Sequence, residues 1–400
     1  MTQRWHIMDF GLSRADGHHY WGAQAISSEL RRRQIDVTLY GRQPLAPDLA
    51  DMGIVPLFRP NMYYPVSNDP HWLELETFVV QNWLVLEDLA RLEGPQFSGA
   101  TVLFPNVTYN QFLAISRWIA AFAPSSRPKA VLVLMFPPEW KCWPGAMPGR
   151  GPWYYQSVWS NLPRESRRHL LLCTQTEEIA RQYEAILGIK PTPLPYYLNR
   201  PAAATSSAVN REHGDGLLVS YLGGGRSERG FELLPGIISS CLTANANLRF
   251  FVQVNPGSEP PRDNVPQLGT DGRVSTHSGT MDEDAYLAAM REAGLILLPL
   301  DPARYRTQSS GVYWQACLSG TPVVVPAGTW MAERVKAHGH GVAFAAFSPD
   351  SIAAAVLDAH CRIAELRVKA GQYADVLRAE HGAAAYVDAI DRLSSGAGAE

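Results

Sequence analysis

The sequence is poor in cysteine, with five among 400 residues, far apart and never in a C-x-x-C pair. This spacing argues against a disulfide framework and against a zinc site, and it fits a reducing compartment. No apolar run reaches the roughly 18 residues that a membrane-spanning helix needs. The stretch Met1–Leu12 also lacks the apolar core of a signal peptide. We therefore expect a cytoplasmic protein that contacts a membrane at most peripherally, at its inner face.

The chain also lacks an excess of basic residues, because its formal net charge is −3 and 18% of its residues are charged. Nucleic-acid binding usually needs a basic surface, so we expect no nucleic-acid partner. The one dense basic run, Arg31–Arg33, lies near the end of an expected helix, where cations interact favourably with the dipole. A hydrophobic content of 46% predicts a folded protein, and a length of 400 residues predicts two domains.

Short apolar strands alternate with helical patterns through the first half of the chain. This alternation predicts a parallel sheet that is covered by helices on both faces. The expected strands are residues 5–10, 36–41, 101–104, 130–135 and 170–173, and the clearest helices are residues 21–34, 112–121 and 177–187.

The composition changes at residues 190–216, where proline, alanine, serine and polar residues predict a linker. We expect an α/β protein with two Rossmann-like domains, residues 1–205 and residues 206–400, the second ending in helices. Ligands of such folds bind at the carboxyl ends of the strands, here in a cleft that the two domains face. The expected strands after the linker are residues 217–223, 248–254, 273–279, 294–300 and 323–325.

The first strand of the second half ends in three glycines and two arginines, within YLGGGRSERGFELLP (Tyr221–Pro235). Glycines let a ligand approach the backbone closely, and Arg226 and Arg229 can both face one anion. The alternative is a flexible turn whose arginines pair with Glu228 or Glu232. The spacing matches neither a dinucleotide fingerprint nor a phosphate loop that ends in Gly-Lys-Ser/Thr.

A second motif, YRTQSSGVYWQACLSGTPVVVP (Tyr305–Pro326), places two hydroxyls and a glycine before a helical run. A helix start exposes unpaired backbone N–H groups and carries partial positive charge, so it suits an anion such as a phosphate. The alternative is that Ser309 or Ser310 only caps the helix.

These two segments and VSTHSGTMDEDAYLAAMREAGLILLPL (Val274–Leu300) resemble the donor-binding half of retaining glycosyltransferases with the GT-B fold, family 4 in particular. LLLCTQTEEIARQYEAILGIKPTPLPYYLN (Leu170–Asn199) is similar to the segment that ends the acceptor domain of that family. The resemblance implies transfer of a sugar from a nucleotide-diphosphate sugar to a hydroxyl of a glycan, lipid-linked or small-molecule acceptor. It implies front-face displacement without a covalent enzyme intermediate, a metal ion or a cofactor.

The resemblance also implies which residues of the second half hold the donor. Arg226 and Arg229 match the basic pair that holds the diphosphate, and they would stabilise its charge as it leaves. The remaining matching positions would touch the phosphates and the nucleobase: Gly224, Gly225, Ser309, Ser310, Gly311, His277 and Gly279.

Two carboxylates of the family are missing from this sequence. Gln315 occupies the position of a glutamate that hydrogen-bonds the ribose hydroxyls, and Thr307 occupies the position of its partner glutamate. A glutamine can still accept from one hydroxyl, so we keep Gln315 as a donor-binding residue. The substitutions leave two alternatives open: a catalytically silent GT-B protein that binds a ligand or a partner, and a sugar-nucleotide epimerase.

In the first half, Gly17, His18 and His19 lie in the loop between the first strand and the first helix. A neutral histidine there could orient an acceptor hydroxyl or touch a phosphate, and we take His19 as the catalytic candidate with Gly17 beside the ligand. The alternative is a pair of hydrated loop histidines.

An aromatic cluster follows the strand at residues 130–135. Its rings could form a sugar-stacking wall, although such rings more often serve packing. The acidic run Asp282–Asp284 opens an expected helix, where acids favour the dipole, so we expect no metal site there. The members of the cluster are Trp140, Trp143, Trp153, Tyr154 and Tyr155, and Glu139 is the ionisable group beside them.

Overall fold

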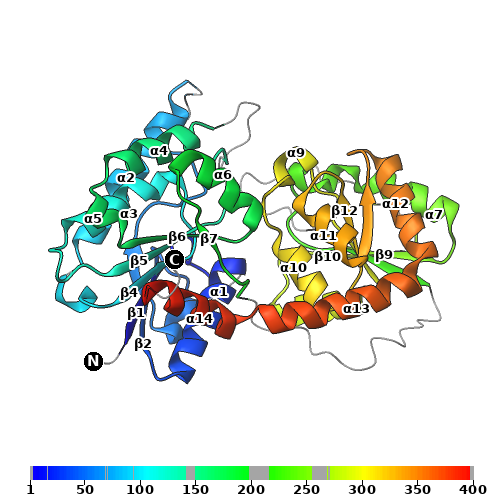
Figure 1. Cartoon of the computed structure of the whole chain (residues 1–400). Helices are drawn as coiled ribbons and strands as arrows, with labels where there is room; N and C mark the ends of the chain where they lie inside the picture. The colour runs from blue at the N-terminus through cyan, green and yellow to red at the C-terminus, as the bar shows by residue number, and fades with distance from the viewer. Residues whose placement is uncertain are drawn as a thin grey trace. The chain divides into compact units, whose positions relative to one another are not determined.

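A computed structural model of the protein describes residues 3–15, 17–67, 69, 71–92, 94–140, 149–197, 216–254, 268 and 271–396. The chain forms two compact units (Figure 1). The first comprises Met1–Asn199 with His381–Glu400, and the second comprises Arg200–Glu380. Each unit contains one sheet whose strands are all parallel, so the predicted α/β class with two Rossmann-like domains is confirmed.

The first unit has a seven-stranded sheet in the order β3-β2-β1-β4-β5-β6-β7. Both faces of the sheet are buried: Val102 packs into one hydrophobic cluster, and its neighbour Leu103 packs into another. This explains why the strands read as continuous apolar runs. The strands are β1 (Arg4–Met8), β2 (Asp36–Arg42), β3 (Val55–Phe58), β4 (Thr101–Phe104), β5 (Lys129–Leu134), β6 (Leu170–Thr174) and β7 (Thr192–Pro193). The helices are α1 (Gly17–Arg32), α2 (Leu73–Ala90), α3 (Tyr109–Ala121), α4 (Gly151–Asn161), α5 (Arg164–Arg167), α6 (Glu177–Leu187) and α14 (Ala383–Ser394).

The second unit has a six-stranded sheet in the order β10-β9-β8-β11-β12-β13. Its central strand β8 sends Val219 and Tyr221 into the hydrophobic cluster that also buries Ile237 and Val356 of two helices. The strands are β8 (Leu217–Tyr221), β9 (Leu248–Val254), β10 (Val274–Ser278), β11 (Leu295–Leu297), β12 (Val323–Pro326) and β13 (Gly341–Phe344). The helices are α7 (Leu234–Ala244), α8 (Glu283–Glu292), α9 (Pro302–Tyr305), α10 (Gly311–Leu318), α11 (Trp330–His338), α12 (Pro349–Cys361) and α13 (Ile363–Glu380).

The last helix of the chain, α14, belongs to the first unit. Tyr386, Val387 and Ile390 of α14 enter the cluster that includes Trp5 of β1. Arg33, directly after α1, pairs with Asp388 at 2.5 Å. The observed units therefore differ from the predicted division into residues 1–205 and 206–400, because local sequence pattern does not reveal which sheet a distant amphipathic helix will cover.

The sequence did not lead us to expect β3, α2, α4 or the short helix α5 of the first unit. The first helix also begins earlier than expected, at Gly17, whose φ of +69° suits glycine. His18 and His19 therefore lie in the first turn of α1, which corrects the prediction of a loop. None of the helices within the described ranges is long and apolar enough to cross a bilayer.

Candidate functional site

The loop that follows β8 was predicted to bind an anion, and we call Gly223–Gly230 the anion loop. It folds back so that Arg229 lies against Gly223. Gly223 has a φ of +111°, and a Cβ atom there would lie 2.5 Å from Nη1 of Arg229. Gly230 has a φ of +67°, and its Cβ would lie 2.1 Å from the carbonyl oxygen of Pro299. Both positions need glycine, since any side chain would be strained and would clash. The glycines thus allow the guanidinium of Arg229 to lie directly against the backbone of the loop.

The two arginines of this loop have different surroundings. Arg226 is half-exposed and pairs with Glu228 at 3.2 Å, as the alternative interpretation of the loop expected. Partial burial and the charge of Arg229 lower the pKa of Arg226 below its usual value. Burial also opposes the charge on Arg229, but Tyr305 and Tyr221 raise its pKa above the usual value.

Arg229 also has a polar atom without a partner. Its Nε is buried and has no hydrogen-bond partner among the described residues. Buried donors are normally satisfied. The guanidinium also lies beside a second cation, so an anion that approached the loop would be attracted by both charges. The single carboxylate of Glu228 compensates only one of the two arginine charges at short range.

The helix start of the second motif lies beside the same loop. A Cβ at Gly223 would lie 3.7 Å from Cγ2 of Val312, the second residue of α10. Ser310 is the N-cap of α10 and accepts from the backbone N–H of Tyr313 at 3.3 Å. Ser309 accepts from the indole N–H of Trp314 at 3.1 Å. Both hydroxyls therefore stabilise the domain itself, and the capping interpretation of Ser310 is confirmed.

A buried glutamine links the anion loop to the end of β10. Gln253 accepts from the backbone N–H of Gly223 at 2.8 Å and donates to the carbonyl oxygen of Gly279 at 3.1 Å. Gln253 was not predicted, although a glutamine in the mostly apolar strand LRFFVQV is an available signal. The structure thus brings three predicted segments together, namely the loop at Gly223–Gly225, the start of α10 and the turn at Gly279.

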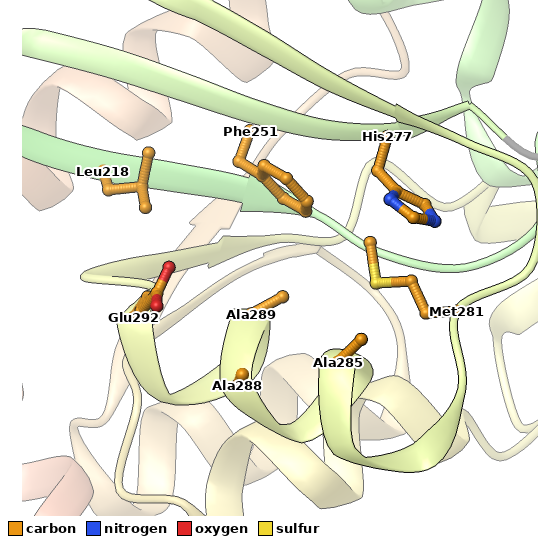
Figure 2. A pocket seen from close by; sticks show the side chains of 8 residues that line it. All are labelled: Leu218, Phe251, His277, Met281, Ala285, Ala288, Ala289 and Glu292. Atoms are coloured by element: carbon orange, nitrogen blue, oxygen red, sulfur yellow. The ribbon is translucent and has the colours of Figure 1, made fainter.

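The side chain of His277 belongs to β10, at the position that pairs with Gln253 of β9. It lines a pocket of about 260 Å³ between the sheet and α8, opposite Met281 (Figure 2). The other lining residues are mostly apolar, and Gly223, Arg229 and Gly311 are not among them. Gln315 is half-buried on α10, and its backbone oxygen accepts from Ser319 at 3.0 Å.

In the first unit, His19 lies at the centre of a polar cluster at the carboxyl ends of the strands. Its Nδ1 lies 2.7 Å from Asp9, which directly follows β1, and 3.1 Å from the Asn106 amide, which follows β4. Its Nε2 lies 2.7 Å from the hydroxyl of Tyr63, and Nε2 of His18 lies 3.1 Å from the same hydroxyl.

Asp9 carries the negative charge of this polar cluster. Burial alone would raise the pKa of Asp9, but His19 and the backbone amide of Gly11 lower it below its usual value. Gly11 also makes room for the imidazole, because a Cβ at that position would lie 2.1 Å from Nε2 of His19. His19 was predicted as a site residue, but its partners were not. Tyr63 and Asn106 follow other strands, and Asp9 lies ten positions before His19.

The predicted aromatic wall divides between core and surface. Tyr154 and Tyr155 are buried in the first hydrophobic cluster, whereas Trp153 is exposed. Trp140 stacks on Phe136 at 4.0 Å, and its ring lies edge-on to Tyr63 at 6.3 Å. Among the described members of the aromatic cluster, Trp140 is the one that lies beside the polar cluster of His19. Trp143 lies outside the described residues, and Glu139 is exposed.

The acidic run at residues 282–284 has a structural role at the start of α8. Asp282 is the N-cap and accepts from the backbone N–H of Ala285 at 2.8 Å. Glu283 and Asp284 follow in the first turn, where their charge favours the helix dipole. In the described parts of the chain, no group of three or more His, Cys, Asp or Glu side chains is arranged to hold a metal ion.

No family model and no curated protein sequence matches the chain. Solved structures do match it over nearly their whole length. The Anabaena protein HepE in complex with UDP has a TM-score of 0.69 at 12% identity, over 98% of this chain and 100% of that chain. An α,α-trehalose 6-phosphate synthase from Burkholderia multivorans has a TM-score of 0.67 at 13% identity, over 100% and 98%.

A third similar structure is the sucrose-phosphate synthase from Thermosynechococcus elongatus. Its TM-score is 0.65 at 15% identity, and the match covers 98% of each chain. At such low identity the likeness concerns the arrangement of strands and helices. These neighbours are glycosyltransferases with two Rossmann-like domains. The protein therefore has the GT-B fold.

Proposed function

We propose that the protein is a retaining glycosyltransferase that moves a sugar from a nucleotide-diphosphate sugar to an acceptor hydroxyl, without a metal ion. The observation that carries this proposal is the approach of Arg229 to the backbone of Gly223, directly beside the start of α10. A loop that gathers two guanidinium groups and a helix N-terminus around one backbone turn suits a diphosphate. HepE was solved in complex with UDP, and a similar structure from E. coli was solved with UDP-2-fluoro glucose, so UDP is the first nucleotide to test.

The chemical role of the loop would be to stabilise the leaving group. When the bond to the sugar breaks, negative charge grows on the diphosphate oxygen that was bonded to it. Arg226, Arg229 and the backbone N–H groups at the start of α10 carry the positive charge that this step needs. Because the two arginines already supply full charges, we propose that no metal ion takes part. No side chain is assigned as a covalent nucleophile, since front-face displacement needs none.

The acceptor would bind to the first unit near His19. The hydroxyl of Tyr63 lies within hydrogen-bond distance of Nε2 of both His18 and His19, and the indole of Trp140 lies beside the Tyr63 ring. This arrangement offers hydrogen bonds to a sugar hydroxyl and an aromatic edge for a sugar ring. We place the reaction in the cytoplasm, a reducing compartment, where cysteines such as the buried Cys173, Cys241 and Cys317 stay free thiols.

The second candidate is a catalytically silent protein that binds a nucleotide. It is favoured by the absence of carboxylates at Thr307 and Gln315, and by the use of both Ser309 and Ser310 in contacts within the domain. Such a protein would keep the affinity of the loop for a diphosphate without turning over a sugar donor.

Calorimetry with UDP, followed by incubation with a panel of UDP-sugars, separates these possibilities. Arg226→Ala and Arg229→Ala should each weaken UDP binding about tenfold or more, since a charge-assisted hydrogen bond contributes roughly 1.5–3 kcal/mol. Arg181→Ala, an exposed arginine of α6, is the control and should bind UDP like the wild type. Unchanged UDP affinity in both loop variants would remove the loop from the site.

Turnover supplies the second half of the test. Release of UDP that depends on an added acceptor, persists in excess EDTA and gives a product with the donor's anomeric configuration would support the full proposal. Tight UDP binding with no release from any donor would identify the silent protein instead. A product of inverted configuration would rule out the retaining assignment.

A further inference from the structure

Helix α2 buries several polar side chains beside the apolar Val85 and Leu89, and it exposes large apolar side chains. Its buried positions include Thr77, Gln81, Asn82 and Asp88. Its exposed positions include Trp72, directly before the helix, and large apolar residues at spacings of three and four: Leu75, Val79, Val80 and Trp83. A surface helix normally shows the opposite pattern.

The inward polar groups of α2 are satisfied by specific partners. Gln81 donates to the carbonyl oxygens of Asn61 and Tyr64 and accepts from Gln111. Asn82 donates to the carbonyl oxygen of Tyr109 and accepts from the backbone N–H of Ala114. The helix is thus anchored by hydrogen bonds, and its outward face is a fixed surface of the folded unit.

The exposed apolar surface continues beyond the helix. Tyr64 and Val66 lie beside it, because the carbonyl of Tyr64 accepts from Gln81 and the N–H of Val66 donates to Thr77. On the other side, helix α4 lies next to α2 (Figure 1), where Tyr154 stacks on Phe78 at 4.0 Å. We call this surface the α2 patch; its members are Tyr64, Val66, Trp72, Leu75, Val79, Val80, Trp83 and Trp153.

The α2 patch is large enough for a specific interface. The exposed fractions of its aromatic side chains are 39% for Tyr64, 56% for Trp72, and 63% each for Trp83 and Trp153. At about 150–250 Å² for each whole side chain, these four contribute roughly 330–550 Å². The four aliphatic residues add to this area, so the patch approaches the about 800 Å² that each partner buries in a standard interface. Continuous apolar patches of this size mark interaction sites.

The charges around the patch favour a protein over a lipid surface. Helix α2 contains no lysine or arginine and exposes the carboxylates of Glu76 and Glu87, whereas anionic headgroups attract basic residues. Glu87 is compensated within the chain, since it pairs with Arg59 at 2.8 Å and accepts from the indole N–H of Trp83 at 2.8 Å. A second copy of the same surface therefore meets little repulsion from this carboxylate.

We propose that the α2 patch is a dimerisation surface and that its occupant is a second copy of this chain. A two-fold axis near the middle of α2 would place the helices antiparallel, with Trp72 of one copy opposite Trp83 of the other. These two tryptophans are 11 positions apart, or about 16 Å along a helix. Because the two-fold axis makes the helices antiparallel, each ring would contact the far end of the exposed apolar face of α2 in the other copy. Tryptophan is one of the residues that are enriched at interface hot spots.

Sedimentation velocity over a concentration series tests the proposal. The wild type should sediment at twice the chain mass of 44.1 kDa, and Val79→Asp should raise the dimer dissociation constant at least about a hundredfold. Val368→Asp is the matched control, because Val368 of α13 is 59% exposed and Val79 is 54% exposed. This control should remain dimeric. The wild type, Val79→Asp and Val368→Asp should all bind UDP equally. A failure of the dimer proposal can therefore be distinguished from a failure of the proposed function.

Two further measurements strengthen the design. Glu76→Gln removes an exposed carboxylate from the stripe and should tighten the dimer, with melting temperature and circular dichroism showing that each variant is folded. A wild type that stays monomeric at 100 μM, or a Val79→Asp variant as dimeric as Val368→Asp, would overturn the proposal. Flotation of a monomeric wild type with phosphatidylcholine–phosphatidylglycerol vesicles, lost in Val79→Asp, would also overturn it and assign the patch to lipid.

Discussion

The carboxylate of Asp9 lies 2.7 Å from Nδ1 of His19, and both groups are buried. A carboxylate can only accept, so Nδ1 carries a proton, and in the neutral imidazole Nε2 is left as an acceptor. The hydroxyl of Tyr63 lies 2.7 Å from that nitrogen. Asp9 thus determines which nitrogen of His19 faces Tyr63, and through it the first unit can move a proton at one defined position.

Replacing Asp9 with asparagine should disturb this order with little change in shape. The amide can donate to Nδ1 as well as accept from it, so the imidazole is no longer held in one tautomer. We expect turnover of the sugar donor to fall at least about tenfold, within the roughly 10²–10⁴-fold that acid–base catalysis supplies, and UDP affinity to stay unchanged. Nitrogen-15 spectra of labelled histidines should show the altered tautomer of His19. Unchanged turnover and spectra would exclude a positioning role for Asp9.

The glycine at position 223 should be irreplaceable even by alanine. With φ at +111° and a Cβ position 2.5 Å from Arg229, Gly223→Ala is strained and displaces the guanidinium. We expect a loss of about 1–3 kcal/mol in unfolding free energy and a weaker affinity for UDP. Gly272→Ala is the control in the same unit, since a Cβ there would meet no atom within 4 Å. Equal behaviour of the two variants in urea unfolding and calorimetry would contradict the role of Gly223.

The ribose position can be tested at Gln315. Gln315→Glu restores a carboxylate that accepts strongly from two neighbouring hydroxyls, whereas Gln315→Ala removes the contact. Nucleoside-diphosphate affinity should therefore rank glutamate at or above glutamine, and glutamine above alanine by about 1 kcal/mol. If the three proteins bound equally while their melting temperatures differed, Gln315 would be a structural residue of α10.

Acidification should destabilise the second unit through His340. Burial, together with the charges of His338 and Arg334, lowers the pKa of this fully buried histidine to about 3. An unfolded histidine titrates near 6.5, so between these values the unfolded chain binds the proton and the folded chain does not. Stability is therefore unaffected above about pH 6.5 and falls below it, by roughly 2 kcal/mol at pH 5.

The contribution of His340 to this loss of stability can be measured by comparing the unfolding free energies of the wild type and His340→Phe at pH 7 and pH 5. The variant loses the contact between His340 Nε2 and the Tyr313 hydroxyl, 3.0 Å apart, and should be less stable at pH 7. Its further loss on acidification should be smaller than that of the wild type. Parallel pH profiles for the two proteins would argue against the titration of His340.

The sheet strands could be predicted because they are buried on both faces and read as short apolar runs. Residues 101–104 and 177–187, for example, were expected as a strand and a helix and form β4 and α6. Helix α2 escaped prediction because its pattern is inverted, with Gln81 and Asn82 inside and Trp83 outside. Periodicity identifies a helix by its apolar stripe but assigns that stripe to the core.

The candidate site was predicted only in part, for a related reason. Arg226, Arg229 and the start of α10 are visible as short motifs, and His19 is visible as one of a histidine pair. Gln253 contacts Gly223 and Gly279, which are 30 and 26 positions away in the sequence. Asp9 contacts His19, ten positions away. A local sequence pattern does not connect residues at such separations. Ser309 and Ser310 have suitable chemistry for an anion, but only the three-dimensional contacts reveal that Trp314 and Tyr313 already use their oxygens.

The return of α14 to the first unit affects the order in which the protein can be completed during synthesis. The first unit begins at the N-terminus, yet Tyr386, Val387 and Ile390 complete the cluster around Trp5. Until these last residues leave the ribosome, that cluster stays open to solvent while the whole of the second unit is made and folded. The first unit is therefore completed only after the second unit has been synthesised, and a nascent chain that still lacks α14 exposes a hydrophobic surface to which chaperones can bind.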